Sequence, residues 1–253
     1  MQQTLQKANA EVGDYFDLGW TIFKENISTF ATFTLVINLP LIVISQFIPQ
    51  PETPEGTIEF TSSNITILVV FYILAIVLGT MSALATHIVS ERAVLRQSID
   101  AKTALQLAVP KIAITVVVSL VASLIIGVGT VLLVVPGIYL AVNLAFIGQA
   151  IALRDCGFDA FQYSRNLVKG QWWKVFGRFL IIGIGFFIIF IVLGFIVGFL
   201  VGIFAAFPIV QLVLNVLLSL VIALAGYFMS VVYTMLFLNL DYVRNAPTPE
   251  VAA

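Results

Sequence analysis

The sequence contains little charge and few of the residues that catalysis uses. Charged residues make up 10% of the 253-residue chain, which has a single histidine, His87, and a single cysteine, Cys156. A soluble domain carries about 25% charged residues, so this composition excludes an ordinary soluble protein. One cysteine excludes an internal disulfide framework, and one histidine with one cysteine is too small a set for a metal site.

The long apolar runs lack ionisable residues in their interiors. Acid–base catalysis needs titratable groups within hydrogen-bond reach of one another. We therefore expect no enzyme, with no catalytic residue, no cofactor and no metal. His87 lies near the end of the second run, and we interpret it as an interfacial residue with its polar tip in water. A proton shuttle is the alternative.

Apolar residues are abundant instead, at 60% of the chain with a mean hydropathy of +1.09, and they fall into six runs. A helix of about 20 residues crosses a hydrocarbon core of about 30 Å. The sequence predicts an all-α, polytopic membrane bundle with six transmembrane helices. The predicted spans are residues 27–48, 65–89, 112–135, 138–153, 175–205 and 209–240, in a single membrane domain, 1–245, followed by a disordered tail, 246–253. Pro40 predicts a kink in the first span, and Arg154 is expected to snorkel from the short fourth span.

Three shorter segments have apolar residues at helical spacing with charges opposite them, at residues 11–26, 98–109 and 158–169. They predict three cytoplasmic amphipathic helices in the membrane interface. In the third, Phe158, Phe161, Leu167 and Val168 are expected to face the membrane. Each segment has a small residue, Gly19, Ala104 or Ser164, followed by an apolar pair and then a helical hairpin. Two interpretations remain open: a three-fold repeat of hairpins about an axis along the membrane normal, or three unrelated hairpins that look alike.

The basic residues are placed on one side of this layout. The predicted connections near residues 49–64, 127–137 and 203–208 contain no Lys or Arg. All twelve fall in the other segments, namely Lys7, Lys24, Arg92, Arg96, Lys102, Lys111, Arg154, Arg165, Lys169, Lys174, Arg178 and Arg244. Under the positive-inside rule, both termini are cytoplasmic. The first 26 residues have no signal-peptide core, so we expect the first span to direct insertion.

Basic and aromatic residues gather between the fourth and fifth spans. Trp anchors and cations suit the headgroup zone of an anionic membrane. We define this group as the basic rim and take it as the candidate lipid-headgroup site: Arg165, Lys169, Trp172, Trp173, Lys174 and Arg178. The alternative is that these cations only set the topology.

Two further patterns concern contacts between helices. Gly194, Gly198 and Gly202 form a double Gly-xxx-Gly stripe that predicts close helix packing, with the same chain as the favoured partner and a second copy as the alternative. Uncharged polar residues in the runs either line a path for a neutral cargo or, as we favour, link helices through hydrogen bonds. This set comprises Asn38, Thr80, Ser82, Ser119, Ser123, Asn143, Gln149, Asn215, Tyr227, Tyr233 and Asn239.

One stretch resembles a known family. The Pro-Gly-Ile-Tyr-Leu corner at 136–140 is followed by Ala160-Phe161, Ser164, Leu167, Lys169-Gly170, Trp172-Trp173 and Phe176. This pattern resembles the YciC-like family of bacterial inner-membrane proteins, and it is similar to the membrane region fused to some glycerophosphodiester phosphodiesterases. The resemblance implies a multi-pass protein of the bacterial inner (plasma) membrane. It implies no catalytic residues, because the phosphodiesterase chemistry belongs to a separate soluble domain.

These patterns favour a non-catalytic integral membrane protein in envelope or lipid organisation. The alternative is a permease for a small neutral or lipid-like substrate. The expected partners are membrane lipids, including anionic phospholipid, and a second copy of the chain or a soluble partner domain. No nucleic acid is expected among the partners.

The one-sided basic residues generate a test of topology. Reporter fusions after Glu55 and Phe207 should score outside, and fusions after Arg96, Lys169 and Arg244 should score inside, because Lys and Arg are retained on the cytoplasmic side. Paired alkaline phosphatase and fluorescent-protein fusions measure this. A cytoplasmic score at Glu55 would overturn the orientation.

Overall fold

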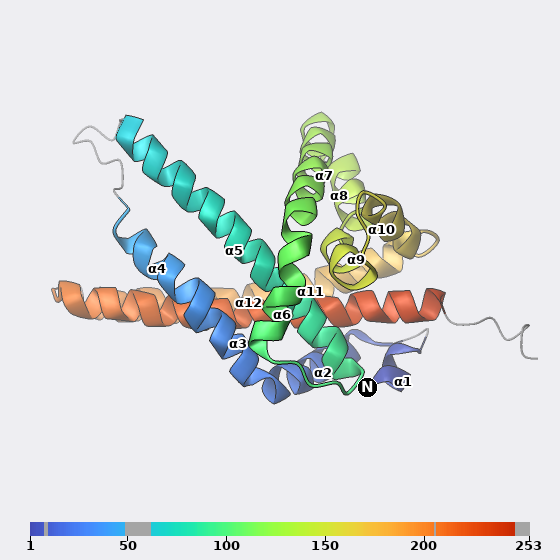
Figure 1. Cartoon of the computed structure of the whole chain (residues 1–253), viewed down its shortest axis with the longest axis horizontal. Helices are drawn as coiled ribbons and strands as arrows, with labels where there is room; N and C mark the ends of the chain where they lie inside the picture. The colour runs from blue at the N-terminus through green and yellow to red at the C-terminus, as the bar shows by residue number, and fades with distance from the viewer. Residues whose placement is uncertain (8–9, 49–61, 205, 246–253) are drawn as a thin grey trace, which may run out of the picture.

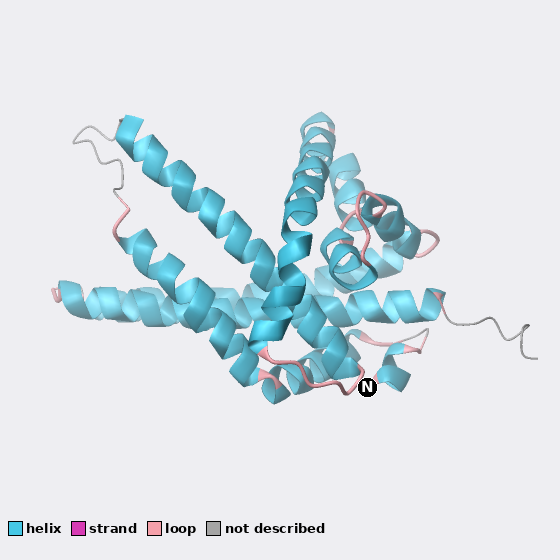
Figure 2. Ribbon diagram, in the orientation of Figure 1, coloured by secondary structure: helices cyan, strands magenta, loops and turns pink. Residues whose placement is uncertain are grey.

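Helices account for all the regular structure in the part of the chain that the computed structural model describes, residues 1–7, 10–48, 62–204 and 206–245, and no strand occurs there (Figure 2). Six stretches are long and apolar enough to cross a membrane, as the sequence predicted: Ile27–Gln46, Ile65–Val94, Ala101–Leu132, Val134–Arg154, Trp172–Ile203 and Pro208–Arg244. The helices are α1 (Gln2–Leu5), α2 (Val12–Glu25), α3 (Ile27–Phe33), α4 (Leu39–Gln46), α5 (Ser62–Val94), α6 (Ala101–Ala108), α7 (Ile112–Leu132), α8 (Val134–Asn143), α9 (Ile147–Arg154), α10 (Ala160–Val168), α11 (Trp172–Ile203) and α12 (Pro208–Arg244).

The long helices form three pairs that diverge from a shared base (Figure 1). In that view α4 and α5 extend to the upper left, α7 and α8 point to the top, and α11 and α12 run along the horizontal axis. The buried core lies in the base. In α12, for example, every buried residue falls between Tyr227 and Asp241, and none falls in residues 208–226. The outer halves of the pairs therefore present apolar side chains on their surface.

Helix α2 lies against the buried half of α12. A methyl group built at Gly19 would be 2.8 Å from Cγ2 of Val232, so the two backbones approach closely because this residue lacks a side chain. Aromatic rings fill the adjoining space: Phe228 of α12 packs edge-on against Phe16 with ring centroids 6.4 Å apart, and Phe23 stacks on Phe30 at 5.2 Å. This contact anchors the N-terminal segment to the last helix.

The three segments predicted as amphipathic are helices α2, α6 and α10, and each has one buried face. The small residues Gly19, Ala104 and Ser164 all lie on those faces. One detail of the prediction was wrong. Leu167 and Val168 of α10 are buried inside the protein rather than turned to the membrane, because α10 packs onto the base of the bundle.

Two predicted spans contain irregular turns. A π-helical turn, Thr34–Asn38, lies directly before α4, where Pro40 predicted a kink. We attribute it to the Pro40 ring, which lacks an N–H and would conflict with the carbonyl four residues earlier in an α-helix. The fourth span is not one short helix as predicted. It is divided into α8 and α9 by a turn at residues 144–146.

Several predicted features fall elsewhere than expected or lie outside the described residues. The last helix continues to Arg244, past the predicted end at residue 240, and so takes in Asp241. The polar connection predicted after the first span lies mostly at residues 49–61, and the predicted tail at residues 246–253; both ranges are outside the described residues.

The α7–α8 contact generates a test of packing. A methyl group built at Gly137 would lie 2.7 Å from the Cα of Thr130, whereas one built at Gly127 of the same helix pair meets nothing within 4 Å. Gly137→Ala should therefore destabilise the detergent-solubilised protein by about 1–3 kcal/mol, since overpacking forces the helices apart. Gly127→Ala should be neutral or stabilising by up to about 1 kcal/mol. Thermal unfolding measures both, and equal melting temperatures would refute the close contact.

Candidate functional site

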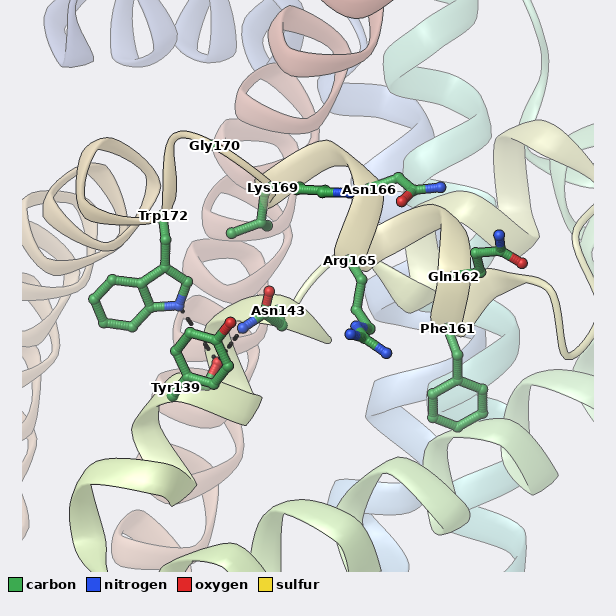
Figure 3. Close-up of a pocket in the computed structure, with 10 residues that line it drawn as sticks. Tyr139, Asn143, Phe161, Gln162, Arg165, Asn166, Lys169, Gly170 and Trp172 are labelled. Carbon is green, nitrogen blue, oxygen red and sulfur yellow. Dashed lines mark hydrogen bonds between the residues drawn. The ribbon is translucent and has the colours of Figure 1, made fainter.

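A pocket of about 580 Å³ lies where α8, α10 and the start of α11 meet (Figure 3). Helix α8 contributes its last two turns, α10 contributes one face, and α11 contributes its first residue. The residues that line the pocket are Tyr139, Asn143, Phe161, Gln162, Arg165, Asn166, Val168, Lys169, Gly170 and Trp172.

Ser164 holds α10 against the break between α8 and α9. Its hydroxyl donates to the carbonyl of Asn143 at 2.7 Å and accepts from the backbone N–H of Phe146 at 3.1 Å. The first group ends α8 and the second ends the turn, where the helical bonding pattern is interrupted. The buried hydroxyl supplies the partners that these two backbone groups would otherwise lack. Gly170, with φ +84°, then ends α10 in a conformation that favours glycine.

Trp172 forms one wall of the pocket. Its indole N–H donates to the carbonyl of Tyr139 at 3.4 Å, and its ring stacks on the Tyr139 ring with centroids 5.6 Å apart. The same carbonyl accepts a bond from the Asn143 side chain at 2.7 Å (Figure 3). These contacts fix the start of α11 against α8.

The side chains that line the pocket carry positive charge and no negative charge. Arg165 and Lys169 line it, and no carboxylate of the described residues lies within 4.0 Å of either cation. The other polar side chains in the lining are mainly the amides of Asn143, Gln162 and Asn166. Figure 3 shows the Arg165 side chain extending from α10 into the space between Tyr139 and Phe161. Two cations and several amide donors, with no acid in the lining, suit an oxyanion such as a phosphate.

The structure brings part of the basic rim together. Arg165, Lys169 and Trp172 line the pocket, and Trp173 lines a neighbouring apolar groove described below. Lys174 is exposed on the first turn of α11 and does not line the pocket.

Arg178 does not belong with them. Its guanidinium donates to the carbonyl of Ala10 at 3.0 Å and lies over the Tyr15 ring, 5.6 Å from the centroid. It lies about 9 Å further along α11 than Trp172, where it contacts the N-terminal segment. Its role in this structure is to hold that segment against the bundle.

The glycine stripe has no partner within the described part of the chain. Apart from the surrounding backbone of α11, no atom there comes within 4 Å of a methyl group built at Gly194, Gly198 or Gly202. The favoured partner, another helix of the same chain, is therefore not found. Packing against a second copy stays a prediction.

Sequence reasoning did not assign Tyr139, Asn143 and the α10 amides to this site. Tyr139 and Asn143 stand four residues apart, so a helix through them places both on one face. That spacing was available in the sequence. The amides Gln162 and Asn166 on α10 have the same spacing.

A second polar cluster links the three helix pairs at their base. Arg154 at the end of α9 donates to Glu91 of α5 at 2.7 Å and to Asp241 of α12 at 3.0 Å. Tyr163 of α10 donates to the other oxygen of Asp241. Burial, followed by this hydrogen bond, raises the pKa of Tyr163 to about 12, so its hydroxyl remains a donor. The expectation that Arg154 snorkels into water was wrong, because its carboxylate partners lie inside the bundle.

His87 is also placed differently from the prediction. It is buried between α5 and α12, and its Nδ1 atom lies 2.8 Å from Oγ1 of Thr234. The interpretation of a water-facing histidine was wrong. Other uncharged polar residues link helices as well: Asn38 donates to Tyr227 at 2.6 Å, and Tyr15 donates to Asn239 at 2.7 Å. The described residues contain no group of three or more His, Cys, Asp or Glu side chains that could hold a metal ion.

Comparisons with known proteins give one match. A family model described as a domain of unknown function (DUF7847) matches residues 111–244, from the start of α7 to the end of α12. The match therefore contains the pocket and two of the three helix pairs. Searches of the curated proteins and of the solved structures gave no match.

The Arg154 cluster generates a test of stability. Asp241→Asn should destabilise the protein by about 2–3 kcal/mol, because it removes the buried one of the two carboxylates that pair with the partly buried Arg154 guanidinium. Asp155→Asn is the matched control: Asp155 pairs with Lys111 at 2.5 Å, but its side chain is 84% exposed, and exposed pairs contribute about 0–1 kcal/mol. Thermal unfolding in detergent compares the two. Equal losses would mean that the buried cluster is no more important than a surface pair.

Proposed function

Because the chain belongs to the DUF7847 family, whose description assigns no function, we propose its role from its own structure. The protein crosses a membrane six times and binds an anionic phospholipid at its cytoplasmic face. It acts without catalysis, in envelope or lipid organisation. The observation that carries this proposal is the pocket lined by Arg165 and Lys169, neither of which has a carboxylate partner among the described residues.

Membrane insertion is supported by the surface of the outer helix halves. Val131, Phe195 and Ile209 are 76–88% exposed, on three different helices, and most of their neighbours are apolar. A soluble monomer rarely exposes apolar patches of more than a few hundred Å². Helices also satisfy their own backbone bonds, as a hydrocarbon environment requires. From the resemblance to the YciC-like family we propose the bacterial inner membrane, and from the one-sided Lys and Arg residues we propose cytoplasmic termini.

The lining of the pocket fits a lipid headgroup. It contains two cations of the basic rim, Arg165 and Lys169, and an indole wall, Trp172. An arginine can hold a phosphate through two hydrogen bonds, whereas a lysine acts as a point charge. Arg165 and Lys169 together offer both contributions.

We also propose that the three helix pairs are repeats. The inner ends of the three returning helices each contribute one charge to the same cluster: Glu91 from α5, Arg154 from α9 and Asp241 from α12. The small residues on α2, α6 and α10 are buried at matching positions before each pair. Three unrelated hairpins would not be expected to share both features.

The permease alternative rests on a different cavity. A small space of about 210 Å³ is lined by Asn38, Ser82, Tyr227 and Ser230, among others, and carries no charge. It is large enough for a few water molecules and smaller than the usual ligand pocket of about 300–1,000 Å³. We therefore rank transport second.

Lipid retention tests the proposal. Purified protein should carry anionic phospholipid, and Arg165→Gln with Lys169→Gln should lower the retained amount, since each cation near an anionic headgroup contributes about 1 kcal/mol. Native mass spectrometry measures the adducts. Lys7→Gln should have no effect, and Lys7→Gln with Arg96→Gln is the matched control, because it removes one Lys and one Arg away from the pocket. If all variants retain the same amount of anionic phospholipid, the basic rim acts only as a topology signal, and the permease becomes the better proposal.

A further inference from the structure

An apolar groove of about 440 Å³ adjoins the cationic pocket. Val135, Ile138 and Tyr139 of α8 form one side, and Trp172, Trp173 and Phe176 of α11 form the other. Tyr139 and Trp172 line both spaces, so the pocket and the groove share a wall.

The groove is built from aromatic rings held in place. Trp172 stacks on Phe176 with centroids 5.1 Å apart and an angle of 9° between the rings, and Trp173 meets Trp172 edge-on at 4.8 Å. Trp173 is 77% exposed, so its indole offers a broad surface to whatever lies beside it. An unbranched chain of methylene groups fits such a surface through dispersion contacts.

We infer that the pocket and the groove form one site for a single phospholipid, with its phosphate at Arg165 and Lys169 and one acyl chain along Trp173 and Phe176. This inference rests on the proposed function and deepens it. The charge of the pocket identifies this occupant. An apolar groove alone would accept any acyl chain, whereas the adjoining cations require a ligand whose anionic group lies next to its apolar chain.

The lining also favours one class of headgroup. It contains no carboxylate that could pair with the ammonium of an ethanolamine headgroup. The Trp172 ring stacks on Tyr139 and Phe176, which reduces the ring face available for a cation–π contact. The amides of Asn143, Gln162 and Asn166 can instead donate to and accept from hydroxyl groups. The site therefore prefers a phosphoglycerol headgroup, which has hydroxyls and no amine, to phosphoethanolamine.

The chain contains three tryptophans, Trp20, Trp172 and Trp173, which makes the site visible by fluorescence. In a Trp20→Phe variant, the emission comes only from the shared wall and the groove. Bromine atoms on an acyl chain quench a tryptophan that they approach closely. The full-length variant is placed in bilayers of equal parts phosphatidylglycerol and phosphatidylethanolamine, with the brominated chain on one lipid or on the other.

Quenching by brominated phosphatidylglycerol should exceed quenching by brominated phosphatidylethanolamine severalfold. Arg165→Gln with Lys169→Gln should remove the excess. The control is Trp172→Phe with Trp173→Phe, which leaves only Trp20 on α2, half exposed and away from the site; both lipids should quench it equally.

The outcomes separate this inference from the proposed function. Equal quenching by the two lipids, with anionic lipid still retained in the mass spectrum, overturns the two-part site and leaves headgroup binding in place. If the Arg165→Gln, Lys169→Gln double variant retains as much anionic phospholipid as the wild type, the proposed function itself is overturned. Excess quenching that survives loss of both cations overturns the assignment of the phosphate to them.

Discussion

The fold depends on one guanidinium. Arg154 ends α9 and holds carboxylates from α5 and α12, Glu91 and Asp241, which lie 63 and 87 residues away along the chain. The apolar core at the base also packs the three pairs together, but apolar contacts are not directional. A partly buried charge that is paired on two sides is costly to separate from the buried Asp241, so this cluster favours one arrangement of the three pairs at their base.

Because the core is concentrated at the base, the outer halves of the helices pack little against other parts of the protein and expose apolar side chains. In lipid, an apolar helix surface needs no protein partner, because hydrocarbon is as apolar as leucine. The specific contacts therefore come from close approach and from polar groups: Gly19 against Val232, His87 with Thr234, and Asn38 with Tyr227. Each of these joins helices from different parts of the sequence.

The sequence predicted the elements better than the contacts between them. Six apolar runs and three amphipathic segments follow from composition and helical spacing, which are local properties. The partners of Arg154 and the burial of His87 depend on residues far along the chain, so no local pattern could give them. Arg178 was grouped with the basic rim because it is near in sequence. In the folded chain it contacts Ala10 and Tyr15 instead. In the site, Arg165, Lys169 and Trp172 were predicted, whereas Tyr139 and Asn143 were not.

The break between α8 and α9 explains why the pocket exists. A buried backbone group without a hydrogen-bond partner costs free energy, so a helix can be interrupted inside a bundle only where other groups replace the lost bonds. Ser164 of α10 bonds the carbonyl of Asn143 and the N–H of Phe146, and Trp172 of α11 bonds the carbonyl of Tyr139. The two Ser164 bonds that satisfy the break therefore also hold α10, one wall of the pocket, against α8, while the Trp172 bond adds the wall from α11. The walls of the pocket are therefore held before a ligand arrives, and the conformational entropy lost on binding falls mainly on the exposed side chains of Arg165 and Lys169.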